Sequence, residues 1–161
     1  MTAEIEPGVV PMIAYADGAA AMDWLADVFG FRERMRMMDG NRLSQGEMET
    51  DFGKVLLASG SDAYEGPRRH SEHCDSVRNW LSVPWVVDGV LVYVANLEAH
   101  YDRARRRGAQ ILTTPEGDWP GLRYRAEDLE GHRWMFMQQP GPDSTDPVSR
   151  DPRQGESCSP N

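Results

Sequence analysis

Two carboxylates in the first third of the chain have a spacing that suits proton transfer. Glu47 and Glu49 lie two residues apart in a polar-apolar stretch that predicts a strand, so both side chains point to one side of it. A groove that raised their pKa would make them general acids or bases. The favoured alternative is that they are solvated or paired with arginines, for which the candidates are Arg34 and Arg36 or Arg123 and Arg125.

A second group with possible chemistry is the run His70-x-x-His73-Cys74. One short amphipathic helix here would place His70 and Cys74 on the same face, at the i,i+4 spacing that suits zinc. The chain has only two further histidines, His100 and His132, whereas a structural zinc site needs four ligands. The favoured interpretation is therefore a half-exposed helix with a buried free cysteine.

The composition of the 161-residue chain excludes one class of partner. Its formal net charge is −9 and its pI is about 4.9, whereas nucleic-acid binding depends on clustered Lys and Arg. The one basic run, residues 103–107, falls in the last turns of a predicted helix, where cations complement the helix dipole. We therefore expect no nucleic-acid partner, and the acidic surface favours neutral or cationic ligands.

The N-terminal residues and the cysteines indicate a cytoplasmic protein without a membrane partner. No basic stretch followed by an apolar run opens the chain, and no apolar run approaches the ~20 residues that span a bilayer. Cys74 and Cys158 are far apart in sequence, so we expect no disulfide and a reducing compartment.

The elements that must position these side chains occur twice in the same order. In the first unit, residues 9–59, a strand from Val9 to Tyr15 precedes a helix that Asp17 caps and Gly30 ends. Three strands follow this helix, at residues 31–38, 42–50 and 54–59. The unit has the order βαβββ.

The second unit, residues 90–138, repeats this order. A strand from Val90 to Ala95 precedes a helix that Asn96 caps and Gly108 ends. Its three strands are expected at residues 109–113, 122–127 and 132–138. The sequence thus predicts an α+β fold of two βαβββ modules with pseudo-twofold symmetry, whose curved mixed sheets enclose a groove.

The rest of the chain divides into three segments. Residues 1–8 form an N-terminal lead, and residues 60–89 form a connecting segment that contains a short helix and is long enough to act as a lid over the groove. Residues 139–161 are rich in Pro, Ser, Asp and Gly, which predicts a disordered tail.

Three motifs carry a resemblance to a known family. They are the run from Asp17 to Leu25 before Phe29-Gly30-Phe31, the hairpin Glu130-Gly131-His132-x-Trp134, and the segment Val83–Val90 with the pattern V-P-W-V-x-D-G-V. Together they resemble the vicinal oxygen chelate superfamily of glyoxalases, bleomycin-resistance proteins and dioxygenases, and most closely an uncharacterised glyoxalase-like branch. Leu129 stands where the family hairpin has proline. Members include lyases, dioxygenases, epimerases, thiol transferases and drug-sequestering proteins, so the resemblance implies a fold more than a function.

The resemblance also implies four metal-ligand positions, one on the first and one on the last strand of each module. Counted from the helix caps and the turn glycines, these positions hold Val10, Leu57, Gly89 and Met135. None offers the oxygen or nitrogen donor that a divalent cation prefers. We therefore predict that the metal is missing, and we expect no other cofactor.

Alternation along the strands extends these positions to a predicted ligand-binding wall. Its residues are Met12, Val55, Leu57, Leu91, Tyr93, Arg133, Met135 and Met137. Such a wall suits an apolar or aromatic small molecule, with Arg133 as the anchor for an anionic group unless Glu47 or Glu49 pairs with it. In the alternative, these side chains fill the groove themselves.

Three functions remain open from the sequence. The favoured one is a metal-free small-molecule binder that works as a homodimer. Its rival is a glyoxalase-like lyase or isomerase, with or without a metal, that uses Glu47 or Glu49 and Tyr93. The third is a structural or regulatory dimer without a ligand.

Overall fold

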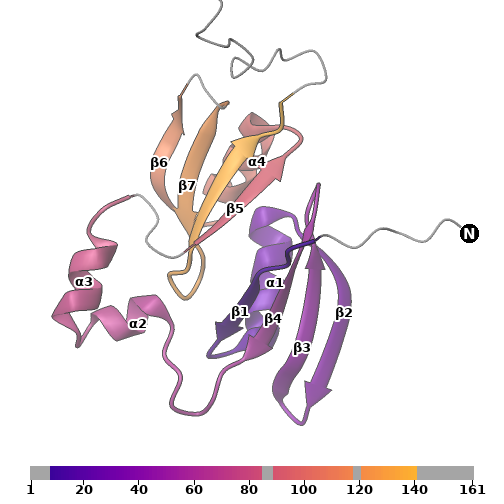
Figure 1. Cartoon of the computed structure of the whole chain (residues 1–161), viewed down its shortest axis with the longest axis vertical. Coiled ribbons are helices and arrows are strands. Elements are labelled where there is room, and N and C mark those ends of the chain that lie inside the picture. The colour runs from indigo at the N-terminus through magenta and orange to yellow at the C-terminus, as the bar shows by residue number, and fades with distance from the viewer. Residues whose placement is uncertain (1–7, 85–88, 118–120, 141–161) are drawn as a thin grey trace, which may run out of the picture.

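The structure is a computed structural model that describes residues 8–84, 89–117 and 121–140. It contains two βαβββ modules, as the sequence predicts (Figure 1). The first consists of β1 (Met12–Tyr15), α1 (Gly18–Phe29), β2 (Arg32–Asp39), β3 (Arg42–Glu49) and β4 (Lys54–Ser59). The second consists of β5 (Gly89–Val94), α4 (Leu97–Arg106), β6 (Gln110–Glu116), β7 (Arg123–Glu127) and β8 (Arg133–Gln138).

Each module forms a four-stranded sheet with the same strand order. The orders are β1-β4-β3-β2 and β5-β8-β7-β6, with the first and last strands of each module parallel and the other pairs antiparallel. Most of the predicted lead and tail, and part of the Val83–Val90 motif, lie outside the described residues.

The long helices begin and end where their caps predict. The side chains of Asp17 and Asn96 accept hydrogen bonds from the backbone N–H groups three residues further on. Gly30 ends α1 in the left-handed region, and Gly108, just beyond α4, also has a positive φ. Among the described helices, none has the length and hydropathy required to cross a bilayer.

Two predicted elements differ from the sequence interpretation. β1 begins at Met12 instead of Val9, directly after Pro11, which has no N–H to donate to a neighbouring strand. The connecting segment contains two short helices instead of one, α2 (Pro67–Ser71) and α3 (Asp75–Leu81). Cys74 is the residue that precedes α3, so His70 and Cys74 do not share a helix face, which corrects that prediction.

An aromatic cluster joins the two modules in one core. The ring of Phe29, at the end of α1, lies 4.7 Å from that of Phe136 and 5.8 Å from that of Trp134, centroid to centroid. The C-terminal ends of the helices are also tied together, because Arg103 donates to the backbone carbonyls of Ala26 and Asp27. Each module therefore completes the burial of the other.

The modules also hold the start of each other's helix, in keeping with a pseudo-twofold relation. Glu130, in the β7–β8 turn, accepts hydrogen bonds from the backbone N–H groups of Ala16 and Asp17 at 2.9 and 3.2 Å. Asp51, in the β3–β4 turn, accepts one from the N–H of Ala95 at 2.8 Å. These turns fix the two sheets relative to one another.

Candidate functional site

The helix of each module covers one face of its sheet, and we call the opposite face the open face. Residues directly opposite one another in neighbouring strands project to the same side of a sheet, so the strand register assigns each residue to a face. The helix-facing side chains of the second sheet include Val92, Trp134 and Phe136, which are buried in the core. Their sequence neighbours therefore form the open face.

The open face of the second sheet is apolar along β5 and the end of β8 and charged along β7, where Arg123, Arg125 and Glu127 lie opposite Met137, Met135 and Arg133. Leu91 lies opposite Met135, and Tyr93 lies opposite Met137. Leu91 and Tyr93 are exposed, Met135 is half-buried and Met137 is buried. The structure thus brings these four predicted residues together on one surface, and their contact with a ligand stays a prediction.

The open face of the first sheet is rich in methionine. Met12 lies opposite Leu56, which in turn lies opposite Glu47, and Glu47 lies opposite Met35. Met37 follows on the same face of β2, opposite Gln45. The two open faces together hold five of the nine methionines in the chain, namely Met12, Met35, Met37, Met135 and Met137.

Val55 and Leu57 lie on the other face of the first sheet, which corrects their predicted position. Both are buried in the core with α1. The count of four residues from the turn glycine fails because Gly53 adjoins β4, whereas His132 separates Gly131 from β8. A shift of one residue moves every side chain of a strand to the opposite face.

Three open-face residues were therefore missed by the sequence argument: Leu56, Met35 and Met37. The alternation Met35-Arg36-Met37 was a usable signal for the two methionines. Arg36 lies on the helix-facing side and pairs with Asp23 of α1 at 2.6 Å. Leu56 could be placed only after the β1–β4 register was known.

Arg133, predicted as the anchor for an anionic ligand group, has protein partners in the structure. The residue is 5% exposed, and its guanidinium lies 2.9 Å from the carboxylate of Glu127. It also donates to the backbone carbonyls of Leu81 at 2.6 Å and Val83 at 2.7 Å. The partner is therefore Glu127, not Glu47 or Glu49, and the guanidinium holds the end of the connecting segment.

The two candidate catalytic carboxylates are both ion-paired. Glu47 lies 3.4 Å from the ammonium of Lys54. Glu49 lies 3.2 Å from the guanidinium of Arg32 and 3.3 Å from that of Arg34. The hydrogen bond from Arg32 lowers the pKa of Glu49, which keeps its carboxylate ionised and unsuited to act as a general acid.

The residues at the metal positions do not fit a divalent cation. Val10 lies before β1, Leu57 is in the core, and Gly89 and Met135 are on the second open face. With the register corrected, Leu56 replaces Leu57 and still offers no donor atom. Across residues 8–84, 89–117 and 121–140, no group of three His, Cys, Asp or Glu side chains is arranged to hold a metal.

The histidines of the connecting segment make other contacts. The rings of His70 and His73 stack with their centroids 5.3 Å apart, and His73 lies 2.6 Å from the carboxylate of Glu65. The hydrogen bond from His73 lowers the pKa of Glu65.

Two cavities lie where β1 approaches β5, beside the open faces. One of about 300 Å³ is lined by Phe52 and Lys54 of the first module and by Leu91 and Tyr93 of the second. The other, of about 360 Å³, lies between Met12 and Gly89 and reaches His132. Each has the size of a small-ligand pocket.

The family of the chain follows from a comparison with family models. The model of the Glyoxalase/Bleomycin resistance protein/Dioxygenase superfamily matches residues 9–136. The chain belongs to this superfamily. The match spans both modules, and it confirms the resemblance read from the helix-start and hairpin motifs. None of the curated proteins matches this member of the superfamily.

Solved structures share the fold of this superfamily member. TioX from Micromonospora sp. ML1 is 26% identical, with a TM-score of 0.61 over 84% of this chain and 98% of that chain. TnmS3, an antibiotic binding protein from Streptomyces sp. CB03234, is 13% identical, with a TM-score of 0.54 over 85% and 100%. FosX, a fosfomycin resistance protein from Listeria monocytogenes, is 8% identical, with a TM-score of 0.55 over 85% and 96%. The last two comparisons show the fold alone.

Proposed function

We propose that this protein binds a neutral, apolar or aromatic small molecule on its open faces, without a metal. The observation that carries the proposal is the set of five methionines on these faces. Methionine is flexible and polarisable, and it is used at surfaces that adapt to irregular apolar partners. Met12 and Met37 are exposed, as are Leu91 and Tyr93, and contiguous exposed apolar surface marks binding sites.

The charges around the open faces support a neutral ligand. Glu47 is paired with Lys54, Glu49 with Arg32, Arg125 with Glu116, and Arg133 with Glu127. A charged ligand group at any of these side chains would have to replace an ion pair, whereas a neutral ligand would leave all four pairs intact. The antibiotic-binding protein TnmS3, which shares the fold, supports a small molecule as the ligand class.

We further propose that two copies of the chain enclose this ligand as a homodimer in the cytoplasm. Met12 is exposed on one sheet, and Leu91 and Tyr93 are exposed on the other. A symmetric partner would cover these side chains, and twofold dimers are the commonest soluble oligomers. Light scattering should give twice the 18.1 kDa chain mass, and a monomer at micromolar concentration would contradict the dimer.

A thermal-shift screen of aromatic metabolites, thiols and glycopeptide drugs tests the binding function. For at least one compound that raises Tm, Met37→Arg should abolish the shift, because Met37 lies on the open face. Met38→Arg is the matched control, since the two methionines are 51% and 44% exposed but lie on opposite faces of β2. Equal effects of the two variants would contradict a ligand on the open face.

The second candidate function is a glyoxalase-like lyase or isomerase. It is favoured by one observation: Glu47 lies on the first open face, opposite Leu56 and Met35. Elemental analysis of protein purified without chelator separates the two functions. A stoichiometric transition metal that is lost in Glu47→Gln would favour the enzyme and overturn the metal-free binder.

A further inference from the structure

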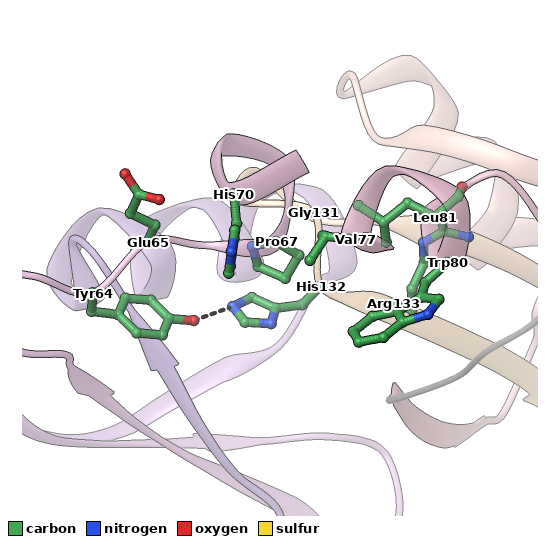
Figure 2. Close-up of a pocket in the computed structure, with 10 residues that line it drawn as sticks. All are labelled: Tyr64, Glu65, Pro67, His70, Val77, Trp80, Leu81, Gly131, His132 and Arg133. Atoms are coloured by element: carbon green, nitrogen blue, oxygen red, sulfur yellow. Dashed lines mark hydrogen bonds between the residues drawn. The ribbon is translucent and has the colours of Figure 1, made fainter. Parts of the chain in front are cut away.

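The connecting segment borders a cavity that is lined by no methionine and that shares His132 and Arg133 with the cavity beside Met12. This cavity has a volume of about 330 Å³ and lies between α2, α3 and the first residues of β8 (Figure 2). Val77, Trp80 and Leu81 of α3 line one end, and the rings of Tyr64, His70 and His132 lie toward the other. The volume corresponds to about ten water molecules at ~30 Å³ each and falls in the range of small-ligand pockets.

Two arginines hold α2 and α3 in place beside this cavity. Arg68 of α2 donates to the backbone carbonyls of Leu129 at 2.7 Å and Asp128 at 2.9 Å. At the other end, Arg133, which also lines the cavity, donates to the carbonyls of Leu81 and Val83. Neither α2 nor α3 contains a buried residue. Hydrogen bonds at both ends therefore position the two helices, and the space between them and the hairpin stays open.

The apolar side of α3 lines the cavity. Val77, Trp80 and Leu81 have the i, i+3, i+4 spacing of one helical face. Trp80 is 59% exposed, although an indole gains more than most side chains from burial. A planar aromatic ring in the cavity would cover this surface and could stack on the indole.

The charged groups at the cavity are already paired. Glu65 lies 2.6 Å from His73 and 3.5 Å from Arg69, and Arg133 is paired with Glu127. A charged ligand would have to compete with these partners or lose its own hydration. The cavity therefore suits a neutral ligand.

The polar groups of the cavity select for a hydrogen-bond acceptor. The Tyr64 hydroxyl donates to the carbonyl of Ala14 at 2.8 Å and lies 3.4 Å from Nε2 of His132. The ring of His132 also packs against the edge of Tyr15, with centroids 4.7 Å apart. Because the Tyr64 hydroxyl hydrogen is used on Ala14, the contact with His132 uses the imidazole N–H on Nε2. A neutral His70 ring also has one N–H, which can bind an acceptor atom of the ligand.

We propose that this cavity is a second binding site, for a neutral planar aromatic molecule that carries a hydrogen-bond acceptor. The ring lies against Trp80 and Val77, and the acceptor atom receives a hydrogen bond from His70. This site goes beyond the proposed function, because it does not depend on a ligand between the open faces or on a dimer.

Quinoline is a suitable probe, since it is planar, neutral above mildly acidic pH and has one acceptor nitrogen. In calorimetric titrations, Trp80→Ala should weaken quinoline binding by roughly tenfold through loss of the aromatic contact. Phe52→Ala is the matched control, because Phe52 is 57% exposed and lines a different cavity. It should leave the affinity within twofold. Naphthalene-2-sulfonate, of similar shape but charged, should bind more weakly than quinoline.

NMR of the imidazole rings keeps the test valid if Trp80→Ala alters the fold. In the unchanged protein, quinoline should shift the signals of His70 and His132 and leave those of the half-buried His100, which does not line this cavity, in place. Met37→Arg should abolish ligand binding on the open face and leave quinoline binding unchanged. The second site is overturned if quinoline does not bind, if Trp80→Ala and Phe52→Ala have equal effects, or if Met37→Arg removes the quinoline signal.

Discussion

The two modules have the same topology but differ in the charged side chains that they bury. Among the described residues, the first buries apolar side chains such as Met22 and Leu25 of α1 against Met48 and Leu57, whereas the second also buries three charged side chains, Glu127, Asp128 and Arg133. From these charged residues and their neighbours, the second module holds the start of α1 and both connecting helices. The two copies of this duplicated unit therefore have different roles, because the second copy holds elements outside itself in place.

One matched pair of cations makes this division measurable. Lys54 opens β4 opposite Glu49, and Arg133 opens β8 opposite Glu127. The side chain of Lys54 is 18% exposed and that of Arg133 is 5% exposed. The predictions below test whether the second module carries the larger share of the stability.

Asp128→Ala should have the largest effect. Asp128 is buried and accepts hydrogen bonds from the Tyr15 hydroxyl at 2.6 Å and the Trp134 indole at 3.0 Å. Both donors would lose their acceptor in the interior, so the free energy of unfolding in urea should fall by about 3–5 kcal/mol. Asp51→Ala removes the related turn contact of the first module, at an exposed site, and should cost about 1 kcal/mol or less. Equal losses in the free energy of unfolding would show that the two modules contribute equally to stability.

Arg133→Met should cause the second-largest loss in the free energy of unfolding. It leaves Glu127 with only the partly exposed Arg68, and it removes two hydrogen bonds that hold the end of α3. The free energy of unfolding should fall by about 3 kcal/mol, within the range for breaking a buried pair. Limited proteolysis should then cut the connecting segment faster than in the unchanged protein. A variant with unchanged stability and proteolysis would restore the earlier prediction that Arg133 is available to a ligand.

Arg133 and Leu57 show what could not be predicted from the sequence. The caps Asp17 and Asn96 and the repeated order of elements are local patterns, and they predicted the fold. Arg133 was placed on the correct face by alternation, but its partner Glu127 belongs to a neighbouring strand whose register the sequence does not specify. Leu57 was misplaced for a related reason, because the two turns differ by one residue between the glycine and the strand.

The third prediction is that His100 makes the stability of the second module depend on pH. Burial lowers the pKa of its imidazole to about 4, whereas an unfolded chain takes up this proton near pH 6.5. The resulting stability is present above pH 6.5 and is lost as the pH falls toward 4, amounting to about 2 kcal/mol. Urea unfolding between pH 7 and 4.5 should show this loss, and His100→Asn should reduce it.

The equivalent position of the first module offers an internal control for this acid sensitivity. Ala21 stands four residues after its cap, as His100 does, and is fully buried. The first module therefore has no titratable group at this point. A pH dependence that is unchanged in His100→Asn would mean that the acid effect arises from carboxylates elsewhere.

The smallest effect is expected for Lys54→Met, the counterpart of Arg133→Met. The Lys54 ammonium lies 3.4 Å from Glu47 in a partly exposed pair, and pairs of this kind contribute about 0–1 kcal/mol to the free energy of unfolding. The free energy of unfolding of the variant should therefore lie within about 1 kcal/mol of that of the unchanged protein. The double variant Glu47→Gln/Lys54→Met should show a coupling of the same small size in a double-mutant cycle. A loss as large as that of Arg133→Met would remove the contrast between the modules, because it would mean that the first sheet also depends on the cation that opens its last strand.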